Sequence, residues 1–137
     1  MHIGDSPEEA AFRAEARAWL SQHASPRSED GGSWHDDLDA HSIACKKWQR
    51  VLFDNGWAGL SWPKQFGGRG GSHLQESIFN EEQAKFDTHT GLFAVSLGMV
   101  GTTLMAHGTP EQQEEFLPKM LSGEHVWCQL FSEPNAG

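Results

Sequence analysis

Apolar residues recur every three or four positions over most of the chain, and polar or glycine-containing breaks divide this pattern into five stretches. Residues at this spacing share one face of a helix, so each stretch predicts an amphipathic helix. The expected helices cover about residues 7–23, 38–54, 73–86, 92–107 and 110–122. The side chains expected to be buried are Phe12, Ala16, Trp19, Leu20, Ala44, Trp48, Val51, Leu52, Leu74, Ile78, Phe79, Phe86, Phe116, Leu117 and Met120. The stretch 92–107 is apolar on most sides, which predicts a central helix.

Three of these helices have the same start signal, a Ser or Thr followed three residues later by Glu or Gln. The pairs are Ser6–Glu9, Ser72–Gln75 and Thr109–Gln112. In such a capping box the hydroxyl accepts from the later amide, and the later side chain reaches back to the first amide. At the other ends, Asn55-Gly56 and Gly123 tolerate the left-handed backbone of a helix C-terminus. These signals fix the expected helix boundaries.

Two longer segments lack helical spacing. Residues 24–37 are polar and contain glycine, which predicts a surface loop. Residues 56–71 contain six glycines and one proline, and they carry Trp62 and Phe66. We expect this second segment to be a loop that packs onto the body through its aromatic side chains.

The run from Val126 to Phe131 is the first β-type pattern in the chain. It leads into Ser-Glu-Pro-Asn-Ala-Gly, which ends at Gly137. The expected fold class is therefore all-α, with a first β-strand at the C-terminus.

Composition and net charge argue against some classes of binding partner. The 137 residues carry a formal net charge of −9. Nucleic acids and anionic membranes bind clustered Lys and Arg, so this charge argues against both. No apolar run approaches the roughly 20 residues of a membrane-spanning helix, and the first residues do not form a secretion signal. Cys45 and Cys128 form no paired motif, which favours free thiols and a cytoplasmic location.

The eight histidines form no recognisable metal-binding pattern. His35 and His41 are too far apart to share one helical face, and neither His-x3-His nor Cys-x2-Cys occurs. We assign no metal site. No Ser-His-Asp or Cys-His arrangement suggests nucleophilic catalysis.

Two segments resemble the acyl-CoA dehydrogenase family. Residues 107–137, HGTPEQQEEFLPKMLSGEHVWCQLFSEPNAG, resemble a family helix, strand and loop, and WPKQFGG at 62–68 resembles a Trp-Pro loop of the same family. The resemblance implies an N-terminal helical domain over 1–125 and the first strand and loop of a β-domain over 126–137. It also implies that the chain is a fragment whose parent continues into a β-domain and a second helical bundle.

The resemblance implies FAD as the cofactor, with Gln129, Leu130, Phe131, Ser132 and Gly137 beside it. The Ser132 hydroxyl would lie near the flavin ring, where fixed donors stabilise the reduced state. From the residues alone, Ser-Glu-Pro is equally ordinary turn chemistry, and a simple strand-turn remains open.

The resemblance also implies an acyl-CoA substrate, with His89, Thr90, Phe93, Ala94 and Leu97 facing the acyl chain. Plain core packing explains the same apolar helix without a ligand, and this alternative stays open. Lys64 or Arg69 could contact a CoA phosphate, although a solvated surface charge is the simpler interpretation.

The implied reaction is the α,β-dehydrogenation of acyl-CoA thioesters in lipid metabolism, including β-oxidation. The family's glutamate base belongs to the C-terminal domain, so no catalytic residue is assigned in this chain, and Glu133 is not given that role. An electron-transfer flavoprotein and a homo- or hetero-oligomer are the implied partners. The alternatives are an acyl-CoA oxidase, a flavin monooxygenase, a non-catalytic subunit and a helical interaction module.

Overall fold

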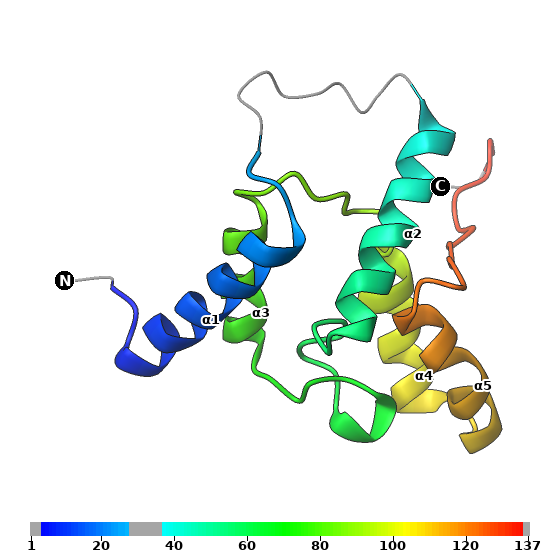
Figure 1. Cartoon of the computed structure of the whole chain (residues 1–137). Helices are drawn as coiled ribbons and strands as arrows, with labels where there is room; N and C mark the ends of the chain where they lie inside the picture. The colour runs from blue at the N-terminus through cyan, green and yellow to red at the C-terminus, as the bar shows by residue number, and fades with distance from the viewer. Residues whose placement is uncertain (1–3, 28–36, 136–137) are drawn as a thin grey trace.

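The computed structural model describes residues 4–27 and 37–135. Its elements are α1 Pro7–His23, α2 Leu38–Asp54, η1 Lys64–Phe66, α3 His73–Gln83, η2 Ser96–Gly101, α4 Thr102–His107 and α5 Pro110–Leu121. Here η1 is a 3₁₀ turn and η2 is a π-helical segment. The expected all-α class is confirmed (Figure 1). Among the described residues, no helix combines the length and apolarity needed to cross a bilayer.

The three predicted capping-box helix starts are confirmed by the hydrogen bonds at the caps. All three capping boxes are formed, at Ser6, Ser72 and Thr109. Gly56 and Gly123 have φ values of 71° and 78°, the left-handed region in which a side chain would be strained. Local sequence therefore determines where these helices begin and end.

An aromatic cluster forms the centre of the fold. The Trp57 ring stacks on Phe79 at 4.9 Å between centroids, and Trp19 lies 5.3 Å from Trp57. Trp48 adds a third indole, 5.8 Å from Trp19. These rings join α1, α2 and α3 through the loop after α2, and large aromatic surfaces of this kind supply much of the burial energy in a small domain.

Helices α1 and α3 pack side by side (Figure 1) and are joined by a buried carboxylate. The Glu82 side chain has no exposed surface and accepts from Arg17 at 2.8 Å and 3.1 Å. Lys85 Nζ lies 2.6 Å from Glu82 Oε1, and Arg13 Nη1 lies 3.1 Å from the same oxygen. Hydrogen bonding, chiefly from Arg17, lowers the pKa of Glu82 to about 2. The carboxylate therefore stays ionised inside the fold.

The Trp62 loop packs as expected, with Trp62 only 4% exposed and Phe66 half-buried. Two glycines lie against Trp62, one at its backbone and one at its ring. A Cβ at Gly68 would be 2.2 Å from the Trp62 carbonyl oxygen, and one at Gly101 would be 2.3 Å from Trp62 Cζ2. Gly101 therefore lets η2 approach the indole, and Gly68 lets the loop fold back onto the Trp62 backbone.

Helix α3 ends three residues earlier than predicted. The chain after Gln83 turns instead to pair with the segment that follows α1, where Asp87 N–H donates to Ser25 at 2.8 Å and Arg27 N–H donates to Lys85 at 3.0 Å. This tertiary pairing replaces the last helical turn. Leu74, expected to be buried, lies in the first turn of α3 and is 53% exposed.

The helix predicted over 92–107 differs in two ways. Its middle is the π-helical segment η2 rather than an α-helix. It is also not enclosed, since Met99 is 46% exposed and Ala94 and Gly98 are exposed. Buried Phe93, Ser96 and Gly101 show that only one side packs inward. The prediction of a central helix rested on apolar composition alone and is therefore wrong.

The strand expected over 126–131 is absent from the described chain. A strand needs a neighbouring strand to satisfy its backbone, and no described residue pairs with this segment in a ladder. The Trp127 amide is bonded to a side chain instead. The proposed domain division at residue 125 stays a prediction, and most of the expected 24–37 loop lies outside the described residues.

Candidate acyl-binding site

The five residues expected to face an acyl chain line one cavity of about 390 Å³. They are His89, Thr90, Phe93, Ala94 and Leu97. The opposite wall consists of the core faces of α2 and α3 with the loop between residues 57 and 60. The structure therefore brings these five residues together around a space rather than packing all of them into a solid core.

The wall of this cavity is mostly aromatic and aliphatic, with a few polar groups at one end. Trp48, Leu52, Trp57 and Phe79 supply its apolar surface. Trp48 Nε1 donates to Gln83 Oε1 at 2.9 Å, and both side chains are buried. Sequence reasoning assigned these aromatic residues to the core and missed their second role. Their position on the inward face of α2 and α3 was the only signal.

The predicted cofactor residues lie apart from this cavity. Gln129, Leu130, Phe131 and Ser132 are exposed and form neither helix nor strand. Leu130 is 89% exposed and Phe131 is 79% exposed. Gly137 lies outside the described residues. Within the described chain these residues do not form one site with the cavity, but they follow an anchored residue that does connect to it.

That anchor is Trp127. Its amide donates to the buried Ser96 hydroxyl at 2.7 Å, and its ring lies edge-on to Phe116 at 5.2 Å. Ser96 belongs to η2, beside the cavity-lining Leu97. Segments of π-helix occur frequently at functional sites. The hydrogen bond thus joins the helix that lines the cavity to the chain that leads into residues 129–132.

Comparison with known proteins identifies the fold and the family. Residues 6–124 match the family described as acyl-CoA dehydrogenase, N-terminal domain. The chain belongs to the acyl-CoA dehydrogenase family. It is 37% identical over 132 residues to acyl-CoA dehydrogenase IpdE1 of Mycolicibacterium smegmatis, a match that covers 92% of this chain and 33% of that protein.

Two solved structures agree with this family assignment. The ChsE4-ChsE5 complex from Mycobacterium tuberculosis gives a TM-score of 0.72 at 27% identity over 100% of this chain and 33% of the matched one. The Tcur3481-Tcur3483 steroid ACAD gives 0.72 at 27% identity over 100% and 34%. The chain spans about a third of the length of these relatives.

In this acyl-CoA dehydrogenase chain, Arg69 is engaged within the fold. Its guanidinium forms an ion pair with Glu15 and lies 4.1 Å from the centre of the Trp57 ring. A cation over an indole is attracted by the negative face of the ring. Arg69 is thus held against the fold by Glu15 and Trp57, with its side chain 31% exposed.

One side-chain pair was missed by sequence reasoning. His41 and Cys45, one turn apart on α2, place Nε2 and Sγ 3.4 Å from each other. Burial raises the pKa of the Cys45 thiol, which disfavours the nucleophilic thiolate. The Cys45 thiol is therefore not activated as a nucleophile. In the described part of the chain, no group of three or more His, Cys, Asp and Glu could hold a metal ion.

Replacing Ser96 with alanine should release the segment after α5 without unfolding the domain. The partly buried Trp127 amide would lose its acceptor, and leaving such a donor unpaired costs about 1–3 kcal/mol locally. We expect the Trp127 amide to exchange with deuterium at least about tenfold faster. Ser122→Ala is the matched control, since the Ser122 hydroxyl bonds only to Lys119 O. Equal exchange in both variants would contradict the anchoring role.

Proposed function

We propose that this chain forms the acyl-binding wall of a protein that carries out FAD-dependent α,β-dehydrogenation of acyl-CoA thioesters. The observation that carries the proposal is the cavity that gathers His89, Thr90, Phe93, Ala94 and Leu97 opposite an aromatic wall. An apolar space with a few polar groups at one end suits a hydrocarbon chain that must be held in one orientation.

The segment 129–132 fits a role beside FAD. Leu130 and Phe131 expose large apolar side chains that an aromatic ring system would cover, and the exposed Ser132 carries a hydroxyl that can donate to it. When bound, FAD supplies the hydride acceptor. The contribution of this chain is to place a hydrogen-bond donor and an apolar surface at that position, with Trp127 fixed behind them by Ser96.

The proton acceptor for the reaction is proposed to come from outside this chain. Glu76 lines the cavity but lies on α3, and no other described carboxylate lines it. Residues of this chain would therefore hold and orient the acyl group and exclude water. We further propose a cytoplasmic protein that passes electrons to an electron-transfer flavoprotein.

The solved relatives suggest the assembly and the substrate class. One is a complex of two named chains, and another is named a steroid ACAD. We propose that this chain likewise works beside a second acyl-CoA dehydrogenase chain. The exposed Ala94 and Gly98 leave one side of the cavity open, which suits a bulky acyl group.

The proposal is tested with the intact protein purified in the presence of FAD. We expect flavin absorption, and acyl-CoA binding that Ala94→Phe weakens by about tenfold or more, which corresponds to 1.4 kcal/mol. The larger ring would fill the cavity rim. Ala106→Phe is the control, because Ala106 is exposed on α4 outside the cavity. A protein that stays colourless with ample FAD, and binds acyl-CoA equally in both variants, would refute the proposal.

A further inference from the structure

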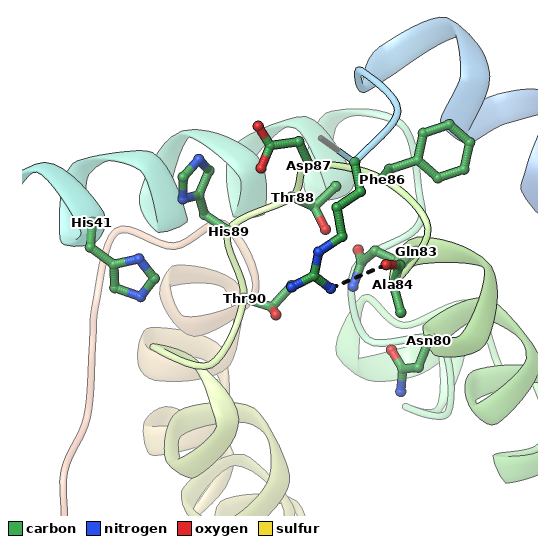
Figure 2. A pocket seen from close by; sticks show the side chains of 10 residues that line it. His41, Asn80, Gln83, Ala84, Phe86, Asp87, Thr88, His89 and Thr90 are labelled. Atoms are coloured by element: carbon green, nitrogen blue, oxygen red, sulfur yellow. Dashed lines mark hydrogen bonds between the residues drawn. The ribbon is translucent and has the colours of Figure 1, made fainter. Parts of the chain in front are cut away.

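A second cavity of about 370 Å³ lies beside the first (Figure 2). Its walls are the N-terminal part of α2, the C-terminal part of α3, residues 84–90, and Arg27 from the segment after α1. The pairing of residues 25–27 with residues 85–87 holds these walls in place. The second cavity is thus built by the same tertiary contact that ends α3 early.

The two cavities meet at four shared residues. Asn80, Gln83, His89 and Thr90 line both. A single layer of polar side chains therefore separates the apolar space from the second one. A molecule that occupies the first cavity would present its far end to these residues.

The second cavity contains a buried polar atom that lacks a partner. His41 Nδ1 is buried and makes no hydrogen bond to any described residue. Its other nitrogen, Nε2, is 3.4 Å from Cys45 Sγ, and the thiol in turn donates to the Thr90 carbonyl at 3.7 Å. Because the thiol proton points to Thr90, His41 Nε2–H donates to the sulfur. In the neutral ring, Nδ1 then holds an open lone pair, and leaving it unsatisfied is costly.

Two side chains with hydrogen-bond donors, Gln83 and Arg27, also line the second cavity. Gln83 Oε1 already accepts from Trp48, which leaves the Gln83 amide N–H groups for another acceptor. The Arg27 guanidinium makes one long bond of 3.4 Å to the Ala84 carbonyl, dashed in Figure 2. The lining also includes the carboxylate of Asp87, so both charges are present around the cavity. A neutral group that both donates and accepts matches this set better than an anion does.

We infer that the second cavity binds a hydroxyl group carried at the far end of the acyl substrate. The hydroxyl would donate to His41 Nδ1 and accept from both the Gln83 amide and the Arg27 guanidinium. This inference rests on the proposed function, because the first cavity must hold the acyl chain for its end to arrive here. The substrate class is therefore a hydroxylated acyl-CoA rather than a plain fatty acyl-CoA.

The test compares three acyl-CoA probes of equal chain length on the intact, FAD-loaded protein. One ends in a methyl group, one in a hydroxyl and one in a carboxylate. We expect the hydroxyl probe to bind about tenfold more tightly than the methyl probe, the scale of a well-made buried hydrogen bond. His41→Phe should reduce that ratio to about one, and Arg27→Gln should reduce it partially. His107→Phe, on the exposed side of α4, should leave the ratio unchanged.

The outcomes separate the two proposals. If no probe binds, the proposed function fails. If the methyl and hydroxyl probes bind equally, or the carboxylate probe binds best, the acyl site stands and the hydroxyl inference is wrong. The ratio of hydroxyl-probe to methyl-probe affinity is measured within each variant. A substitution that weakens the binding of both probes equally therefore leaves this ratio unchanged. If His41→Phe does not fold, an unchanged ratio in Arg27→Gln also overturns the inference.

Discussion

Gly101→Ala should destabilise the fold by about 3 kcal/mol, the upper range for overpacking a filled core. The new methyl group would lie 2.3 Å from Cζ2 and 2.6 Å from Cη2 of Trp62. The indole has little room to move away, because Trp62 is 4% exposed and Gly68 lies against its backbone and Cβ. The strain must therefore separate η2 from the Trp62 loop. Chemical denaturation followed by circular dichroism measures the loss.

Gly98→Ala is the matched control for this prediction. Gly98 lies in the same π-helical segment, but a Cβ there meets nothing within 4 Å. Alanine should leave stability unchanged or raise it by up to about 1 kcal/mol, since glycine is unfavourable in helices. If both variants lose stability equally, the cause is the helix backbone and not the contact with Trp62.

Glu82→Gln should cost about 3 kcal/mol, because it leaves three cationic groups around a neutral amide. Removing one partner of a buried ion pair is destabilising on this scale. Arg17 and Lys85 are about half exposed and can regain water, so the loss should stay near the lower end of that range. Glu81→Gln is the control. Its side chain is 62% exposed and pairs only with Arg13, and an exposed pair contributes less than about 1 kcal/mol.

The Glu82 effect should also depend on pH in a defined direction. The folded pKa of about 2 lies below the ordinary value of 4.5, so folding favours the ionised form. Its contribution is complete above pH 4.5 and is lost as the pH falls toward 2. The stability gap between the natural protein and Glu82→Gln should narrow over that interval. A gap that stays constant from pH 6 to about pH 3 would contradict this linkage.

Helix boundaries could be predicted from sequence because they depend on neighbouring residues. Each capping box closes within four residues, and Gly56 or Gly123 acts through its own backbone freedom. The start of α2 at Leu38 and its end at Asp54 were also predicted correctly. Local chemistry carries this information, so one sequence suffices for it.

The features that the sequence did not predict all depend on contacts between residues distant in the chain. The end of α3 is decided by pairing with residues 25–27, some 60 positions away, which no local pattern reveals. The inward side of η2 contacts Trp62 through Gly101 and Trp127 through Ser96, and both partners are distant in the sequence. Family resemblance predicted five residues that do line one cavity, whereas the aromatic wall and the second cavity needed the fold.

The bond between Ser96 and Trp127 has a mechanical consequence. Leu97 touches the acyl space, and its neighbour Ser96 holds the chain that leads to the residues proposed for the flavin. A thicker acyl group that displaces this turn would pull Trp127 along with it. The width of the substrate would then affect the position of the residues proposed to lie beside the flavin. Substrate selectivity and electron transfer would be coupled through this hydrogen bond.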